Sequence, residues 1–208
     1  MTDPNFHITT PRLYLSHLIA SNDAHCDFIV HLYNTPEFVA SIGGTPTSIT
    51  TTAAARQYIE NRFQAEHSKN GYGTYLVSLQ PNSPGISSNN SFSEVLKECT
   101  PIGTVSLTRG LGEDAYKAPD VGFAIIPELN GKGYATEAAR VLIDYARENL
   151  GVDAVFGFFA KGNARSRRVV EKLGFEDRGV RSLKCFGGAA SEVWAFPGMD
   201  ADLEVYGL

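Results

Sequence analysis

The sequence predicts an α+β fold in which a mixed sheet of about seven strands carries helices on both faces. Short apolar runs with strand-like alternation are interspersed with longer segments whose apolar residues recur at helical spacing. The order of these segments, β-α-α-β-β-β-α-β-α-β-β, combines runs of strands with strand–helix–strand units and so predicts a mixed sheet. The chain has 208 residues, of which 43% are hydrophobic and 20% charged, as in ordinary globular proteins. We therefore expect a single domain over residues 1–208.

Five segments are expected in the first part of the chain. They are a strand over 12–18, a helix over 21–34, a broken segment over 34–46, a helix over 51–71 and a strand over 74–80. Ser21 or Asn22 would cap the first helix, because a side-chain oxygen at that position can accept from free helix amides. Thr51 or Thr52 would do the same for the second helix, which Gly71 ends.

A polar insertion is expected over 81–99. Its first part, PNSPGISSNNS at 81–91, is rich in turn-forming residues and offers little apolar surface to bury. We therefore expect this part to be dispensable for stability and ligand binding.

Strands and helices alternate in the rest of the chain. The expected elements are strands over 100–110 and 121–126, a helix ending at 149, a strand over 153–160, a helix over 163–174, and strands over 176–186 and 191–196. Asn163 is the expected N-cap of the last helix and Gly174 its C-cap.

A glycine turn, Gly131-Lys132-Gly133, connects the strand DVGFAIIP to the helix YATEAARVLIDYAREN. The first turn of a helix leaves its N–H groups without partners, and the helix dipole makes that end positive. Because glycines let an anion approach the backbone, this stretch predicts a phosphate site. Its spacing fits neither a P-loop nor a Gly-x-Gly-x-x-Gly dinucleotide fingerprint. A plain strand–turn–helix connection is the alternative.

Charge and composition argue against several classes of function. The formal net charge is -5 with no basic stripe, so we expect no nucleic-acid partner. No apolar run approaches a membrane span, and the polar N-terminus is not a signal peptide, so we expect no membrane partner. Cys26, Cys99 and Cys185 lack metal or redox spacing, which favours a reducing compartment, the cytoplasm. The five histidines form no metal constellation, so we expect no metal.

Two motifs in sequence, VGFAIIPELNGKGYATEAARVLIDYA and NARSRRVVEKLGF, resemble the GNAT superfamily of acyl-CoA-dependent N-acetyltransferases. The chain is most similar to the branch of ribosomal-protein N-terminal acetyltransferases (RimJ/RimL-type), and the resemblance covers nearly its whole length. It implies a mostly antiparallel sheet that splays at the acyl-CoA site, and a reaction that transfers an acetyl group from acetyl-CoA to an amine.

The resemblance also implies which residues hold acetyl-CoA. The family pattern Gln/Arg-x-x-Gly-x-Gly/Ala falls on the glycine turn, with Asn130 as a departure in the Gln/Arg place. The pyrophosphate would lie on the amides of this turn, and the pantetheine amides would pair with the preceding strand. The implied residues are Phe123, Ala124, Ile125, Ile126, Asn130, Gly131, Lys132, Gly133, Tyr134, Ala135, Thr136, Asn163 and Ser166.

Two residues are candidates for the chemistry. Relatives often carry a glutamate two residues before the strand glycine, and Asp120 stands there as the candidate general base, directly or through a water. Alternatively, Asp120 simply ends its loop, and Glu113 or Asp114 acts as the base. Many relatives carry a tyrosine where this chain has Val170, so we expect Ser166 to stabilise the thiolate instead.

The acceptor amine is the least determined part. Tyr33, Phe38, Glu113 and Trp194 are candidates to line its pocket, although aromatic residues at such places are more often core. We expect direct transfer in a ternary complex rather than through Cys185, which lacks a group to lower its pKa and is expected to be buried. The protein would be a monomer or a homodimer. An alternative function is a catalytically silent acyl-CoA-binding sensor or scaffold.

Overall fold

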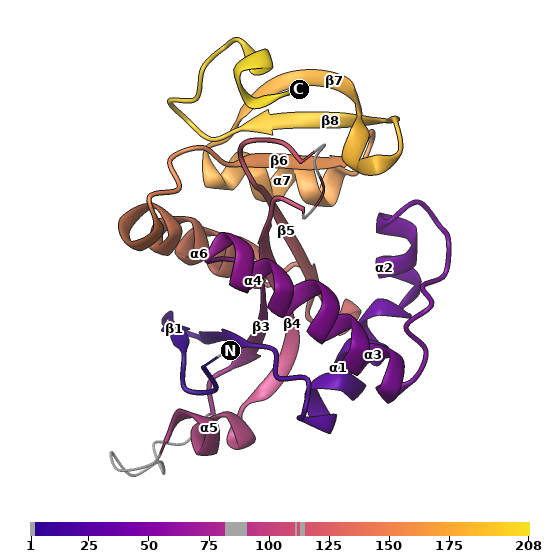
Figure 1. Cartoon of the computed structure of the whole chain (residues 1–208), viewed down its shortest axis with the longest axis vertical. Coiled ribbons are helices and arrows are strands. Elements are labelled where there is room, and N and C mark those ends of the chain that lie inside the picture. Colours follow the sequence, from indigo (N-terminus) through magenta and orange to yellow (C-terminus); the bar gives the residue numbers. More distant parts are fainter. Residues whose placement is uncertain (1–2, 82–90, 111, 113–114) are drawn as a thin grey trace.

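A computed structural model describes residues 3–81, 91–110, 112 and 115–208 (Figure 1). Its one described sheet has eight strands in the order β1-β2-β3-β4-β5-β6-β8-β7. The strands are β1 His7–Thr9, β2 Leu13–His17, β3 Thr74–Leu79, β4 Thr100–Thr108, β5 Asp120–Ile125, β6 Phe156–Ala160, β7 Glu176–Leu183 and β8 Ala189–Ala195. Neighbouring strands are antiparallel except β5 and β6, which are parallel. The predicted mixed, mostly antiparallel sheet is confirmed. The short edge strand β1 was not predicted.

The helices of the described residues are α1 Asp23–Tyr33, α2 Pro36–Ser41, α3 Thr52–Tyr58, α4 Ala65–Asn70, α5 Phe92–Val95, α6 Tyr134–Leu150 and α7 Ala164–Leu173, and the π-helical segment Ile59–Gln64 joins α3 to α4. The predicted helices over 21–34, 51–71, up to 149 and 163–174 are present, whereas two short helices, α2 in the segment expected to be broken and α5 in the expected polar insertion, were not predicted. The helix predicted over 51–71 is one continuous rod with a π-helical middle, which apolar spacing alone does not reveal.

The predicted helix caps are confirmed. The side chain of Asn22 accepts from Ala24 N at 3.0 Å, and that of Thr51 accepts from Ala54 N at 3.1 Å. Asn163 likewise caps α7, and Gly174 ends it with a left-handed φ of 86°. These side chains satisfy amides that the first turn of each helix leaves free.

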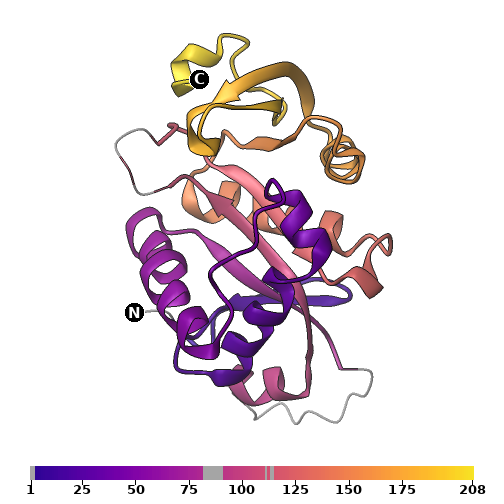
Figure 2. The ribbon, with the colours of Figure 1, turned by 90° about the vertical axis from the view of Figure 1, so that its right-hand side faces the viewer.

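Helices cover the two faces of the sheet, as Figures 1 and 2 show. Leu142 and Ile143 of α6 pack with Val77 of β3 in the larger core, which α7 also joins. Leu76, the neighbour of Val77, packs instead with α1 and α3 in the second core. Successive residues of a strand point to opposite faces, so β3 contributes to both cores.

Two predictions for the chain's connections are wrong. The last part of the expected polar insertion over 81–99 forms α5, where Phe92 is buried and stacks on His7 with ring centroids 3.9 Å apart. Residues 82–90 lie outside the described part. The strand expected over 176–186 ends at Leu183 and a 3-10 turn, Lys184–Phe186, follows, which leaves Cys185 exposed rather than buried.

The sheet opens between β5 and β6. The described pairing of these strands has one register pair, Asp120 with Phe156, whereas β5 stays paired with β4 as far as Ile125. Beyond Asp120 the two parallel strands therefore diverge, and the opening between them positions the candidate site.

Candidate active site

A cleft of about 830 Å³ lies where β5 and β6 separate. Four parts of the chain contribute to its walls: the end of β5, the glycine turn with the start of α6, the start of α7, and α2. Of the residues predicted to hold acetyl-CoA, the structure brings together Phe123, Ala124, Ile125, Asn130, Gly131, Gly133, Tyr134, Ala135, Thr136, Asn163 and Ser166. Ile126, which packs on the second core, and Lys132 do not line the cleft.

The end of β5 presents free backbone groups to the cleft. Ile126 N donates to Ile102 O at 2.9 Å, so the backbone N–H and C=O groups of Ile126, and of every second residue before it in β5, point toward β4. In an antiparallel ladder the residues between them point the other way, so the N–H and C=O groups of Phe123 and Ile125 face β6. Since β6 pairs only at Asp120 in the described structure, these groups are available to a ligand.

The glycine turn has the geometry of an anion site. Gly131 and Gly133 have left-handed φ angles of 78° and 84°, and α6 begins at Tyr134 with no side-chain cap. Asn130 N donates to Pro127 O at 3.2 Å, and within the described part of the chain the next amide that donates to the backbone is that of Glu137, to Gly133 O at 3.0 Å. A Cβ on Gly131 would meet nothing within 4 Å. The amides of residues 131–136 are therefore free beside open space, as phosphate binding requires.

The start of α7 forms the opposite wall. Asn163 Oδ1 accepts from Ser166 N at 3.1 Å, and both residues line the cleft. Val170, one turn later, is buried, and a Cβ on Gly157 of β6 would lie 2.9 Å from its Cγ1. A tyrosine at position 170 would need space that the core already fills.

Asp120 lies at the point of divergence but not in the wall of the cleft. By strand alternation its side chain shares the face of Ala124, on the side of α1 and α3, and not that of Val121. Burial, with a smaller contribution from the charge of Glu66, raises the pKa of Asp120 from 3.8 to about 7. A carboxyl group with this pKa takes up and releases protons near neutral pH.

Glu66 of α4 is a second carboxylate on this face. Its side chain is buried, and its Oε1 pairs with Arg62 Nη2 at 3.1 Å. Burial raises the pKa of Glu66, and the Arg62 charge and the Gly110 backbone oppose that effect. The sequence offered no sign of this residue, because a helical glutamate is ordinarily solvent-exposed.

The residues predicted to line an acceptor pocket lie in different parts of the structure. Phe38 lines the cleft, and Tyr33 stacks behind it in the second core with ring centroids 4.1 Å apart. Trp194 lies in the larger core, where its Nε1 donates to Glu192 Oε2 at 3.3 Å, and it lines none of the described cavities. We therefore do not retain Trp194 as an acceptor residue. Glu113 and Asp114 lie outside the described residues.

Several residues of the cleft were not predicted. Three cations of α7, Arg165, Arg168 and Lys172, line it together, and so do Thr35 and Glu37 at the start of α2. The spacing of the three cations, one and two helical turns apart, was the available sign, because such residues share a helix face.

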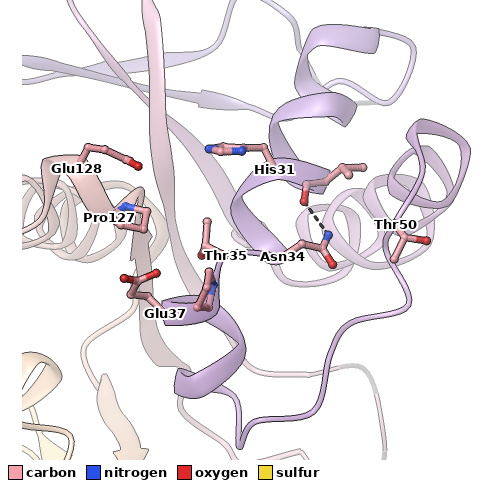
Figure 3. A pocket seen from close by; sticks show the side chains of 9 residues that line it. His31, Asn34, Thr35, Glu37, Thr50, Pro127 and Glu128 are labelled. Carbon is pink, nitrogen blue, oxygen red and sulfur yellow. Dashed lines mark hydrogen bonds between the residues drawn. The ribbon is translucent and has the colours of Figure 1, made fainter.

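A second hollow, of about 680 Å³, shares Thr35 and Glu37 with the cleft. Figure 3 shows the carboxylates of Glu37 and Glu128 and the ring of His31 around the same space. This hollow lies between the end of α1 and the turn that follows β5, and it gives this side of the cleft an acidic border.

Two further findings concern the described residues alone. They contain no group of three or more His, Cys, Asp or Glu side chains arranged to hold a metal ion. None of their helices is both long enough and apolar enough to cross a membrane.

Comparison with known proteins establishes the family. The domain described as "Acetyltransferase (GNAT) domain" matches residues 12–176. Because this match covers well over half of the sequence, the chain belongs to the GNAT acetyltransferase family, and the predicted resemblance is confirmed.

Individual relatives agree with this assignment. YjcK of Bacillus subtilis, named a probable N-acetyltransferase, is 38% identical over 82 residues, which are 38% of this chain and 43% of YjcK. The FsC-acetyl coenzyme A-N(2)-transacetylase of Aspergillus fumigatus is 28% identical over 145 residues, 66% of this chain and 57% of that protein. The chain thus spans about half the length of these curated relatives.

Solved structures share the fold. RimL, a ribosomal alpha-N-protein acetyltransferase in complex with coenzyme A, aligns with a TM-score of 0.66 at 17% identity. The alignment covers 95% of this chain and 100% of RimL.

Proposed function

We propose that this chain transfers an acetyl group from acetyl-CoA to a primary amine, by direct attack within a ternary complex. The observation that carries the proposal is the cleft itself. One wall offers the unpaired backbone edge of β5, another offers the free amides of the glycine turn, and a third offers the start of α7. A long donor with both amide and phosphate groups fits this combination.

The phosphates of the donor would lie toward the positive groups. The pyrophosphate would accept from the free amides between Gly131 and Thr136, where the dipole of α6 favours negative charge. The cations Arg165, Arg168 and Lys172 add positive charge on the facing wall. The pantetheine amides would pair with the free groups of Phe123 and Ile125, as an added strand pairs with a sheet edge.

The reacting carbonyl and sulfur would lie between β5 and α7. A free N–H of Phe123 or Ile125 would polarise the thioester carbonyl, and it acts most strongly when negative charge develops on that oxygen. As the C–S bond breaks, the Ser166 hydroxyl would donate to the thiolate. Ser166 lies in the first turn of α7, whose dipole also favours a negative charge.

Asp120 is the proposed general base. The amine nitrogen forms a C–N bond with the acetyl carbon, and its proton passes to the Asp120 carboxylate, directly or through a water. A base works best when its pKa lies near the working pH, and the value of about 7 for Asp120 meets that condition. Asp120 faces the side opposite α6, which is where an acceptor would enter.

The acceptor is proposed to be a small molecule or a protein N-terminus. Phe38 and Glu37 line the part of the cleft toward α2, and Glu128 extends the acidic border, which suits a cationic amine. The three cysteines are free, which suits a reducing compartment such as the cytoplasm. Whether the protein works as a monomer or a homodimer does not alter this scheme.

The test is thiol release from acetyl-CoA in the presence of a panel of amines, including amino acids, polyamines and short peptides. Release above the rate without an amine, with N-acetylated product by mass spectrometry, is the expected result. Asp144→Asn, at an exposed site on α6, is a matched control for Asp120→Asn. Tight acetyl-CoA binding without turnover on any amine would favour the silent sensor or scaffold instead.

A further inference from the structure

A cluster of side chains behind the glycine turn connects the N-terminal part of the chain to α6. Arg12, the residue before β2, lies 120 positions before Lys132, and its Nη1 donates to Lys132 O at 3.1 Å. Its Nε donates to Glu137 Oε2 at 2.7 Å, and its Nη2 pairs with the same oxygen at 2.5 Å. Its guanidinium also lies over the ring of Tyr134, 4.5 Å from the centroid.

Glu137 is held from both sides in this cluster. Its Oε1 accepts from Thr10 Oγ1 at 2.6 Å and from Arg12 N at 3.2 Å, so both oxygens have partners. Burial would raise the pKa of Glu137, but the bonds from Thr10 and Arg12 hold it below its usual range. Glu137 is therefore a charged, fixed anchor for the Arg12 guanidinium.

The bond to the Lys132 carbonyl has a geometric consequence for the turn. A trans peptide group is planar, and its C=O and N–H point in opposite directions. Because Arg12 holds the Lys132 carbonyl, the N–H of Gly133 in the same peptide group points away from Arg12. Gly133 lines the cleft whereas Lys132 does not, so the fixed N–H is the one on the cleft side.

Gly133 itself needs this support. Its φ of 84° is left-handed, and α6 begins after it without a side-chain cap. Glycine populates many backbone conformations, so a glycine turn is costly to fix in one of them. Arg12 also holds Tyr134, the first residue of α6, through its ring.

We propose that Arg12 and Glu137 are positioning residues that fix the glycine turn in its phosphate-binding form before the donor arrives. This inference rests on the proposed function, because it takes the pyrophosphate of CoA as the anion bound at the turn. Preorganisation of this kind raises affinity by removing the ordering cost from the binding step.

Replacing Glu137 tests this proposal, because two explanations predict opposite changes in the affinity for CoA. If only charge mattered, replacing a carboxylate next to an anion site would tighten binding of the negatively charged CoA. If Glu137 acts by holding Arg12, Glu137→Met weakens binding although a negative charge has been removed. Arg12→Met weakens binding for the same reason.

The experiment compares the affinity for CoA by calorimetry in wild type, Arg12→Met and Glu137→Met. Each variant loses one end of a charge-assisted pair, so a loss of roughly ten- to a hundredfold is expected. Glu148→Met removes a carboxylate from an exposed site on α6, and Arg56→Met breaks a similar pair with Asp23 far from the cleft. Both controls should bind CoA like wild type.

A second measurement, without ligand, separates the positioning role of Arg12 and Glu137 from the proposed function. Backbone ¹⁵N order parameters of residues 131–136, from NMR relaxation, should be lower in Arg12→Met and Glu137→Met than in wild type and the controls. Lower order parameters in these two variants, with no CoA binding by wild type, would support the positioning role and overturn the proposed function. Unchanged order parameters, or CoA binding by Glu137→Met as tight as wild type or tighter, would overturn the positioning role.

Arg12→Lys serves if Arg12→Met does not fold. A lysine keeps the charge and much of the apolar stem, but its single ammonium cannot hold the carboxylate and the carbonyl with the planar fork of an arginine. An intermediate affinity is expected, and full wild-type affinity would contradict the proposal.

Discussion

Asp120 pairs with Phe156 in parallel register, and this is the one register pair between β5 and β6 in the described structure. Asp120 is the first residue of β5, so its carboxyl group lies where the opening begins. The free backbone amides of β5 point along the plane of the sheet toward β6, whereas the Asp120 side chain points out of that plane, toward the side of α1 and α3. In the proposed function, β5 would therefore hold the donor along its edge and receive the acceptor on the face of Asp120.

The first prediction concerns the pH dependence of the reaction. A base acts only when deprotonated, so kcat/KM of wild type should rise with pH up to about 7 and then level off, following Asp120. Asp120→Asn removes this limb and should lower kcat/KM on the order of 10²–10⁴-fold between pH 7 and the pKa of the amine. The loss should shrink at higher pH, where the free amine no longer needs a base. A wild-type profile for Asp120→Asn would move the base to another group.

The charge of Glu66 is expected to contribute to the raised pKa of the Asp120 carboxyl group. Its charge favours the protonated form of Asp120, so Glu66→Gln should lower the pKa of Asp120. Carbon-detected NMR titration of the Asp120 carboxyl group measures this directly, without an acceptor amine. Glu60→Gln, at an exposed position of the same rod, is the control and should leave the Asp120 titration in place. An identical titration in the Glu66 variant would show that burial alone sets the value.

Gly133→Val tests the phosphate turn. The variant places a branched side chain at a left-handed φ, which strains the turn, and its Cβ would lie 3.5 Å from Nη2 of Arg12, whose guanidinium holds the turn. CoA affinity by calorimetry should fall well over tenfold. Gly151→Val has a similar backbone conformation at the other end of α6, with φ of 67°, and should cost stability but not affinity. Equal CoA affinity in the two folded variants would contradict the assignment of this turn.

Ser166→Ala should slow the reaction by a factor that does not vary with pH. A serine hydroxyl does not titrate in the working range, and its proposed bond forms only as negative charge develops on sulfur. We expect a drop in kcat with little change in CoA affinity, since the phosphate site is untouched. Ser68→Ala, at an exposed position of α4, is the control. A pH-dependent loss would mean that Ser166 acts through a titrating neighbour.

Phe92→Ala should destabilise the fold although the residue lies in the predicted polar insertion. The side chain is buried, stacks on His7 and meets Tyr14 edge-on. Removing a buried phenylalanine costs roughly 3 kcal/mol, which would lower Tm by several degrees. Phe186→Ala, at a site 45% exposed, should change Tm little. If both variants melted like wild type, α5 would be dispensable after all.

Local sequence patterns predicted most of the fold for physical reasons that stay local. Caps such as Asn22 and Asn163 act on amides two or three residues away, and the glycine turn is fixed by its own φ angles. The residues expected to hold acetyl-CoA followed from the family motif, and most of them line one cleft. Helical periodicity did not reveal the π-helical middle segment, because its apolar residues keep nearly the same spacing.

Long-range contacts account for what was missed. Glu66 looked like a surface glutamate, and nothing near it in sequence indicates that it would be buried on the same face as Asp120. Trp194 looked like a pocket residue, but the sheet carries it into the larger core. Phe92 looked isolated in a polar stretch until His7 of an unpredicted strand stacked on it.

The divergence of β5 and β6 also shapes how the protein holds together. The strands from β1 to β5 form one group of continuously paired strands, and β6, β8 and β7 form another. A single described register pair connects the two groups. The two groups of strands are therefore coupled mainly through side chains, both in the larger core with α6 and α7 and in a third cluster where Tyr116 and Ala118 pack with Phe156 and Leu183. Each group is a natural unit of local unfolding. A molecule lying in the opening, bonded to both sides, would supply part of the ladder that the chain leaves out. Besides reacting, such a molecule would connect the two cooperative units and so stabilise the folded protein against local unfolding.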